Sequence, residues 1–144
     1  MITAGVDIGS SSAKAIILNE GSIIASSIIP TGPGSAETAL RVIHEALSID
    51  GLALDDITYV VATGYGRINV PFANKNVTEI SCHARGIVSI FPQVRTILDM
   101  GGQDCKAIRC DETGRVLRFQ MNEKCAAGTG RYLERISKTL KIPL

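Results

Sequence analysis

Two short stretches of the sequence place an acidic residue and a glycine directly after an apolar segment. Asp7 and Gly9 stand in VDIGSSSAKAII (residues 6–17), and Asp99 and Gly101 stand in LDMGGQDCKAIR (residues 98–109). A glycine lets the backbone turn tightly and approach a ligand, and the N–H groups after it can converge on phosphate oxygens. A carboxylate at such a turn can hold Mg²⁺ through waters or position an attacking water. The spacing therefore favours binding of the phosphates of a nucleotide.

The residues after each glycine supply the candidate phosphate ligands. The N–H groups of Ser10 to Ser12 and of Gly102 to Asp104 can form an anion nest. Ser10 and Ser12 add hydroxyl donors, and Gln103 can orient a water because its amide both donates and accepts. Lys14 lies on the strand after the first turn. The candidate catalytic residues are Asp7, Asp99 and Gln103.

The two stretches form an internal repeat. The aligned pairs are Asp7 with Asp99, Gly9 with Gly101, Lys14 with Lys106, Ala15 with Ala107 and Ile16 with Ile108. A single copy would be read as an ordinary hairpin turn, because such turns are rich in Asp and Gly. Two copies in register instead indicate two related domains that face each other, with a nucleotide as their ligand.

A cysteine ahead of a glycine-rich helix start is the third feature: Cys125 in NEKCAAGTGR (residues 122–131). The partial positive charge of a helix N-terminus lowers the pKa of a thiol and favours a thiolate bound to an anionic metal cluster. One cysteine cannot hold an iron–sulfur cluster, which needs about four thiolates. Either a homodimer with a further cysteine completes the set, or Cys125 is a small buried residue. Spacing alone favours the buried residue.

The expected elements alternate between strands and helices, which predicts an α/β fold. Strands are expected at residues 2–7, 13–18, 22–29, 57–62 and 95–100, and helices at 36–48, Glu79 to Phe91 and Thr129 to Lys141. The repeat divides the chain into a first domain, residues 1–93, and an incomplete second domain, residues 94–144. GYGRIN at 64–69 lacks the spacing of a dinucleotide site, but as a connection after a buried strand it can approach the ligand.

The composition excludes several classes of function. Hydrophobic residues make up 45% of the 144 residues, which is enough for a core, and the net charge of +1 gives no reason to expect nucleic acid or an anionic membrane as a partner. No signal peptide or bilayer-spanning run is present, so a cytoplasmic location is expected. The cysteines lack CxxC spacing and are expected to be free thiols or metal ligands. His83, beside Cys82, is interpreted as a cap or cleft residue.

The sequence resembles the activator ATPases of 2-hydroxyacyl-CoA dehydratases and the related ATPase subunits of benzoyl-CoA reductase. The motifs that carry the resemblance run in family order along nearly the whole chain: GVDIGSSSAKAII, ATGYGR, EISCHARG, LDMGGQDCKAI and MNEKCAAGTGR. The resemblance implies the actin-like (ribonuclease H-like) ATPase fold, with two domains around a nucleotide cleft. It also implies the function: ATP hydrolysis drives a low-potential electron into an acyl-CoA dehydratase or reductase.

The resemblance also implies a site. After Gly9, the first phosphate loop corresponds to Ser10, Ser11, Ser12, Ala13 and Lys14, and the second to Gly101, Gly102 and Gln103, beside Asp104. Cys125 corresponds to one ligand of a [4Fe–4S] cluster shared between the subunits of a homodimer, near helices whose angle changes with ATP binding and hydrolysis. The implied cofactor is ATP or ADP with Mg²⁺, and the implied electron donor is a ferredoxin or flavodoxin. Family members are about twice as long on the usual domain-size scale, so a second ligand cysteine and the adenosine-binding glycines are expected after Leu144.

Two other functions fit part of the sequence. A sugar- or acid-kinase-like phosphotransferase would need a substrate base in the first domain, and it would leave CAAGTGR unexplained. A truncated module that binds a nucleotide or a partner without turnover would expose apolar sheet edges and aggregate or pair with another chain.

Overall fold

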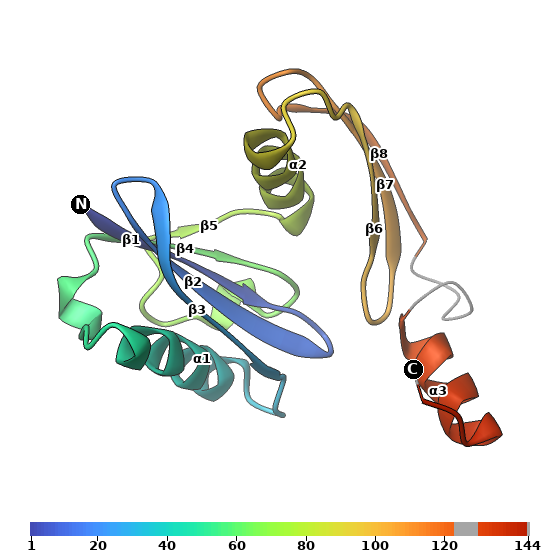
Figure 1. Ribbon diagram of the computed structural model, residues 1–144, viewed down its shortest axis with the longest axis horizontal. Coiled ribbons are helices and arrows are strands. Elements are labelled where there is room, and N and C mark those ends of the chain that lie inside the picture. Colours follow the sequence, from blue (N-terminus) through green and yellow to red (C-terminus); the bar gives the residue numbers. More distant parts are fainter. Residues whose placement is uncertain (123–129, 144) are drawn as a thin grey trace. The chain divides into compact units, whose positions relative to one another are not determined.

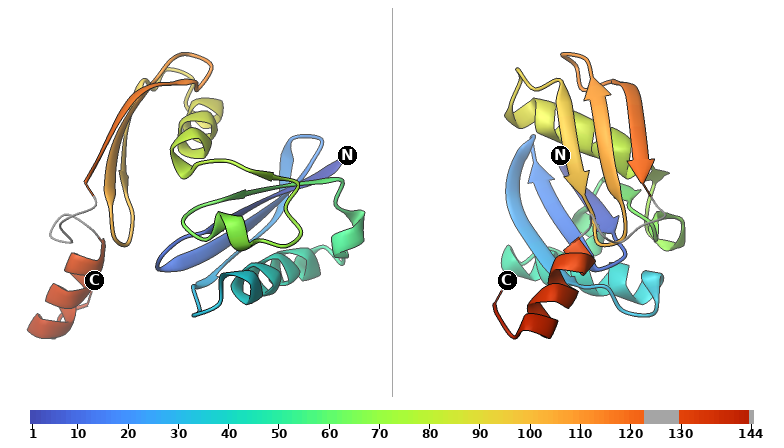
Figure 2. Two further views of the ribbon diagram at one scale, coloured as in Figure 1. Left: turned by 180° about the vertical axis from the view of Figure 1, so that it is seen from behind. Right: turned by 90° about the vertical axis from the view of Figure 1, so that its right-hand side faces the viewer.

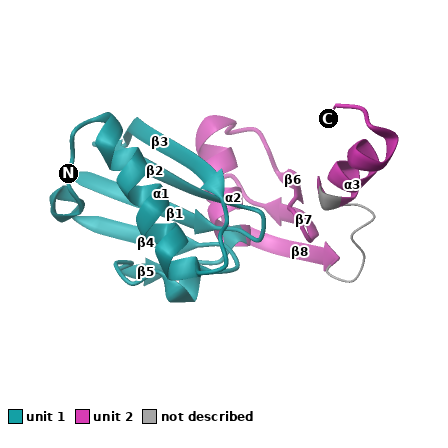
Figure 3. Ribbon diagram, turned by 90° about the horizontal axis from the view of Figure 1, so that it is seen from below, with its two compact units in different colours: residues 1–79 teal, residues 80–144 magenta. Residues whose placement is uncertain are grey.

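The computed structural model describes residues 1–122 and 130–143 (Figure 1). The chain forms two compact units, Met1–Glu79 and Ile80–Leu144 (Figure 3). Each unit carries one of the two Asp-x-Gly turns, and each is described by itself. No helix in the described ranges is both long and apolar enough to cross a membrane.

Unit 1 is built on a five-stranded sheet with the strand order β3-β2-β1-β4-β5. β1 pairs antiparallel with β2, and β2 with β3, whereas β4 runs parallel to β1 and β5 parallel to β4. The sequence predicted four of the strands; the two-residue β5 is an addition. The strands are β1 (Ile2–Ile8), β2 (Ser12–Asn19), β3 (Ser22–Pro30), β4 (Tyr59–Thr63) and β5 (Lys75–Asn76).

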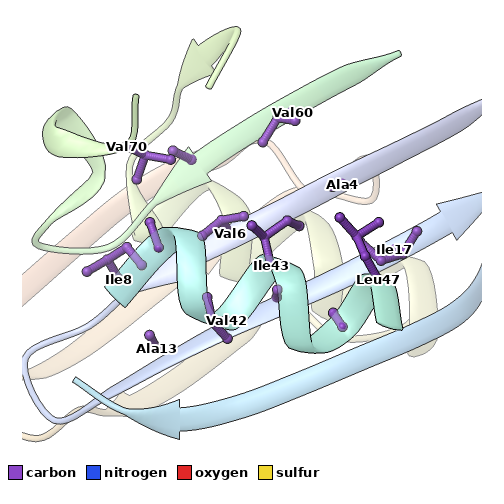
Figure 4. Packing of buried hydrophobic residues seen from close by; sticks show 14 of the residues in the cluster. Ala4, Val6, Ile8, Ala13, Ile17, Val42, Ile43, Leu47, Val60 and Val70 are labelled. Carbon is purple, nitrogen blue, oxygen red and sulfur yellow. The ribbon is translucent and has the colours of Figure 1, made fainter. Parts of the chain in front are cut away.

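The helix α1 (Ser35–Ile49) covers one face of this sheet (Figures 1 and 2). Side chains alternate between the two faces of a strand, so every second residue of β1, β2 and β4 points toward α1. The buried cluster includes Ala4, Val6, Ile8, Ala13, Ile17 and Val60 of the sheet with Val42, Ile43 and Leu47 of α1 (Figure 4). The same alternation places Asp7 on the opposite face, away from this core.

Two short 3-10 helices flank β4 in unit 1. They are η1 (Leu54–Asp56) before the strand and η2 (Arg67–Asn69) after it. The Asp56 carboxylate accepts a hydrogen bond of 2.8 Å from the N–H of Ala53, which stabilises η1. This turn explains why β4 begins at Tyr59 and not at residue 57, as the sequence predicted.

Unit 2 contains a three-stranded antiparallel sheet with the order β6-β7-β8. Ile80, Ala84 and Val88 of α2 form a small buried cluster with Ile108 and Cys110 of β7. α2 therefore packs with unit 2, and the predicted division of the chain into the domains 1–93 and 94–144 stays a prediction. The elements are α2 (Glu79–Ile90), β6 (Thr96–Met100), β7 (Cys105–Cys110), β8 (Val116–Asn122) and α3 (Gly130–Leu140).

The internal repeat seen in the sequence is present in the geometry of both units. In unit 1, Asp7 is the cross-strand neighbour of Lys14, and in unit 2 Asp99 is the cross-strand neighbour of Lys106. The turns close alike: the N–H of Gly9 donates to the carbonyl of Ser12 at 3.1 Å, and the N–H of Gly101 to the carbonyl of Asp104 at 2.9 Å. The alignment of the two stretches is thus confirmed down to one hydrogen bond.

Candidate functional site

The candidate site of unit 1 is a row of three side chains across neighbouring strands. Asp7, near the end of β1, has Lys14 of β2 on one side and Thr63 of β4 on the other. Lys14 Nζ lies 3.0 Å from Asp7 Oδ2 and also contacts the carbonyl oxygen of Ser12 at 3.4 Å. The Lys14 side chain is 42% exposed. Because the Lys14 ammonium reaches solvent, it can move from the Asp7 carboxylate to an incoming anion without being left as a buried, unpaired charge.

The turn between β1 and β2 is held by the residue that follows β3. Thr31 Oγ1 donates to the carbonyl of Gly9 at 2.8 Å, and the Thr31 N–H donates to the carbonyl of Ser11 at 3.1 Å. Together with the bond from Gly9 to Ser12, these contacts give partners to three carbonyl oxygens of the turn. Carbonyls that are held in this way do not repel an anion as free ones would, which suits the predicted phosphate loop.

Two buried hydroxyl oxygens near this turn have no hydrogen-bond partner within the described residues. They are Ser11 Oγ and Thr63 Oγ1. A buried hydroxyl without a partner loses its hydrogen bonds to water and gains nothing in return. Ser11 belongs to the predicted phosphate loop, whereas Thr63 was not predicted from the sequence. The available signal was the TG dipeptide directly after an apolar strand, a shorter form of the Asp-x-Gly pattern.

The loop GYGR (residues 64–67) contacts the end of β1. Gly64 has φ +85, and a Cβ there would lie 2.2 Å from Asp7 Oδ1 and 2.6 Å from the carbonyl oxygen of Ile8. The Gly66 N–H donates to the same Ile8 carbonyl at 2.9 Å. Arg67 Nη1 closes the loop with a bond of 2.9 Å to the Gly64 carbonyl and lies 3.5 Å from Glu79 Oε2. The loop is therefore part of the surroundings of Asp7.

Unit 2 contains a second candidate site, which is centred on Asp99. His83 Nδ1 of α2 lies 3.0 Å from Asp99 Oδ2, and Lys106 Nζ lies 3.6 Å from the same oxygen. The hydrogen bond from His83 and the charges of His83 and Lys106 hold the pKa of Asp99 below its usual range, against an opposing effect of burial. Asp99 is therefore an ionised carboxylate with a fixed orientation, as a water-positioning or Mg²⁺-binding group requires.

Lys106 has a different environment from its repeat partner Lys14. Its side chain is only 4% exposed, and its ammonium lies 2.7 Å from Asp104 Oδ1 as well as close to Asp99. The Asp104 carboxylate is thus engaged inside the turn, whereas the predicted Gln103 side chain is exposed at its tip. The Gly101 carbonyl accepts a hydrogen bond of 3.2 Å from the N–H of Gly130, where α3 begins. This bond connects the second turn directly to α3.

Cys125, the predicted cluster ligand, lies outside the described residues. The other three cysteines, Cys82, Cys105 and Cys110, are free thiols. Within residues 1–122 and 130–143, no three or more His, Cys, Asp or Glu side chains are grouped as a metal site requires. The described residues therefore do not by themselves fit an iron–sulfur cluster.

The sequence pattern of the BadF/BadG/BcrA/BcrD ATPase family matches residues 4–144, which is almost the whole chain. The chain belongs to this family. Among curated relatives, it is 50% identical to the activator of lactoyl-CoA dehydratase from Anaerotignum propionicum, over 100% of this chain and 56% of the relative. The resemblance deduced from the sequence motifs is thereby confirmed.

Two solved structures of the BadF/BadG/BcrA/BcrD family share the fold closely. The activator of the 2-hydroxyisocaproyl-CoA dehydratase from Clostridium difficile, with bound ADPNP, has a TM-score of 0.93 and 48% identity, over 99% of this chain and 53% of that one. Component A of the (R)-2-hydroxyglutaryl-CoA dehydratase from Acidaminococcus fermentans has a TM-score of 0.93 and 41% identity, over 99% and 55% of the two chains. The predicted actin-like ATPase fold is confirmed. The chain spans about half the length of these relatives.

Proposed function

We propose that the complete protein containing this chain is an ATP-dependent activator that drives a low-potential electron into an acyl-CoA dehydratase or reductase. The observation that carries the proposal is the pair of Asp-x-Gly turns, each with a lysine beside its aspartate, in a chain of this ATPase family. Relatives named as dehydratase activators, one of them with a bound ATP analogue, favour this reading over a kinase-like phosphotransferase. A cytoplasmic location is part of the proposal.

The first turn is proposed to bind the nucleotide phosphates through the residues that follow Gly9. The Lys14 side chain is exposed enough to solvent for its ammonium to swing from the Asp7 carboxylate to a phosphate oxygen. The buried Ser11 hydroxyl, which has no partner in the part of the chain that the structure describes, supports the same assignment, because a phosphate oxygen could accept its hydrogen bond. Mg²⁺, bound with the nucleotide, would be held through waters by the carboxylates of Asp7 and Asp99 and would neutralise phosphate charge.

The hydrolysis itself is proposed to need little covalent chemistry from the protein. A water adds to the γ-phosphorus, the bond to the β,γ-bridging oxygen breaks, and ADP, phosphate and a proton are released. Asp7, Asp99 and Gln103 are proposed to position this water, since the aspartates accept its hydrogen bonds and the exposed Gln103 amide can both donate and accept. The role of these residues is orientation rather than nucleophilic attack.

The electron-transfer part of the proposal concerns Cys125. We propose that it holds part of a [4Fe–4S] cluster shared between two subunits of a homodimer, with a ferredoxin or flavodoxin as electron donor. The hydrogen bond between Gly130 and Gly101 supports a coupling of the two functions, because it joins the second phosphate turn to the helix that follows Cys125. If nucleotide binding displaced that turn, the hydrogen bond would carry the displacement to the start of α3.

The ATPase proposal is tested on the complete protein by measuring phosphate release from MgATP. Asp7→Asn and Gln103→Ala are expected to slow turnover by roughly 10²-fold or more, because both remove a group that orients the reacting water. Asp55→Asn and Gln120→Ala, which change exposed residues of the same types away from the turns, serve as matched controls. A wild-type protein that releases no phosphate would overturn the proposal, and unchanged turnover in a variant would remove that residue from the mechanism.

The cluster proposal is tested separately by anaerobic iron analysis. Cys125→Ala is expected to abolish iron binding by the complete protein while MgATP binding persists. Cys82→Ala, which removes a partly exposed thiol, is the matched control and should keep its iron. Iron retained at wild-type stoichiometry in Cys125→Ala would refute the ligand role of Cys125 but leave the ATPase proposal standing.

A further inference from the structure

Thr63 carries the least explained polar group of unit 1. Its Oγ1 is buried and has no hydrogen-bond partner within the described residues. Native structures rarely leave a buried hydroxyl in this condition, so the group calls for a functional explanation. Thr63 stands outside the predicted phosphate loops and is not needed for the proposed function as stated above.

The position of Thr63 relates it directly to Asp7. The two residues are register partners on the parallel strands β1 and β4, where each strand comes to its carboxyl end. Side chains of register partners point to the same face of a sheet, and neighbouring strands lie about 4.8 Å apart. Asp7 therefore has Thr63 as its neighbour on one side and Lys14 on the other, and the three side chains form one row across the sheet.

The surroundings fix this relation. Gly64 directly follows Thr63, and its Cα lies so close to Asp7 that a Cβ would come within 2.2 Å of Oδ1. The backbone after Thr63 is thus held against the carboxylate. In the described structure, Asp7 Oδ2 is taken by Lys14, whereas the Thr63 hydroxyl has nothing to donate to. Because Thr63 Oγ1 is enclosed, its hydroxyl is more readily satisfied by a protein acceptor that rotation about χ1 brings within reach than by bulk solvent.

We propose that Thr63 is a positioning residue for Asp7: its hydroxyl donates a hydrogen bond to the Asp7 carboxylate in the nucleotide-bound state, when Lys14 has moved to a phosphate. The carboxylate then keeps a neighbouring donor and keeps its orientation toward the reacting water. Thr63 does not itself touch the nucleotide. This inference rests on the proposed ATPase function and adds a residue to it.

The test compares Thr63→Val with Thr63→Ser in the complete protein. Valine keeps the shape and removes the hydroxyl, and serine keeps the hydroxyl. For Thr63→Val we expect kcat for MgATP hydrolysis to fall roughly tenfold to a hundredfold, as for a misplaced catalytic group. KM is expected to stay near the wild-type value, since Thr63 does not contact the nucleotide. Thr63→Ser should keep most of the wild-type kcat.

A stability measurement separates this role from a structural one. Because the hydroxyl has no hydrogen-bond partner within the described residues, Thr63→Val should leave the nucleotide-free Tm unchanged or raise it. Thr3→Val, which removes a hydroxyl from the same face of β1 at the far end of the strand, is the matched control and should leave kcat unchanged.

Each outcome decides the inference. It is overturned by a wild-type kcat in Thr63→Val, by equal losses in Thr63→Val and Thr63→Ser, or by a lowered nucleotide-free Tm in Thr63→Val. A rise in KM without a fall in kcat would assign Thr63 to nucleotide binding instead, which also contradicts it. Failure of the ATPase proposal appears in the wild-type protein, which would then release no phosphate, and is thereby distinguished from failure of this inference.

Discussion

The close approach of Gly64 to Asp7 predicts a loss of stability in Gly64→Ala, and its size can be worked out by comparison with Gly21. Gly64 has φ +85 and Gly21, in the turn between β2 and β3, has φ +82. An alanine at either position adopts the same left-handed backbone, which costs about 1–2 kcal/mol. Around Gly21 there is nothing within 4 Å of an added Cβ, so Gly21→Ala measures the backbone strain alone.

At Gly64 the added methyl group has further costs. It would lie 2.2 Å from Asp7 Oδ1, 2.6 Å from the Ile8 carbonyl oxygen and 2.8 Å from the Ile8 carbonyl carbon. Ile8 is 1% exposed and part of the core, so its backbone cannot move aside without disturbing the packing on α1. Overpacking of this kind costs about 1–3 kcal/mol. Gly64→Ala is therefore expected to lower the free energy of unfolding by about 2–5 kcal/mol.

Urea unfolding of the complete protein measures both variants, and the difference between them isolates the steric contact. MgATP hydrolysis is the second readout: Gly64→Ala should also slow turnover, because the displaced part is Asp7, whereas Gly21→Ala should not. If Gly64→Ala lost no more stability than Gly21→Ala, the loop could not lie against the carboxylate. The surroundings of Asp7 described above would then be wrong.

Two further predictions concern unit 2. Lys106→Met should lower the free energy of unfolding by about 3 kcal/mol, because it removes the buried cation that Asp99 and Asp104 share. Lys14→Met, at a half-exposed pair, should cost less than about 1 kcal/mol; equal losses in urea unfolding would contradict the contrast. The pKa of Asp99 is lowered from 3.8, so its contribution to stability is present above that pH and is lost as the pH falls through the folded-state pKa. Asp99→Asn should therefore flatten the fall of the urea midpoint below pH 4, and an unchanged slope would refute the linkage.

The sequence predicted those elements of the fold that a local pattern of residues determines. Apolar runs define β1 to β3, and the helical spacing of Ala36, Leu40, Ile43 and Leu47 predicted the helix of residues 36–48. The buried face of α1 includes Ile43 and Leu47 of that set, but Leu40 is exposed. The repeat of Asp, Gly and Lys at constant spacing correctly aligned the two turns, whereas the position of each aspartate beside the lysine of the next strand emerged only from the structure. These features depend on residues that are close together in the chain, so their spacing carries the information.

The parts that the sequence did not reveal depend on contacts between distant segments. Thr63 adjoins Asp7 only because β4 pairs in parallel with β1, and nothing within β4 states that register. His83 was interpreted as a cap or cleft residue, and its contact with Asp99 joins α2 to β6. Lys14 and Lys106 are the same residue type at equivalent positions of the repeat. Their exposures differ because Asp104 and the surroundings of Asp99 enclose only the second.

This difference in burial assigns different physical roles to two turns that share one geometry. At the first turn, the ion pair is half exposed and two hydroxyls have no partner among the described residues, so a ligand could both displace the lysine and supply hydrogen bonds. At the second turn, a buried lysine joins Asp99 and Asp104, and His83 holds the same aspartate. Breaking that network costs several times more than breaking the exposed pair. If the turns bind the nucleotide as proposed, rearrangement is expected at Lys14 and Asp7, while the second turn is expected to move as a rigid piece that is hydrogen-bonded through Gly101 to α3.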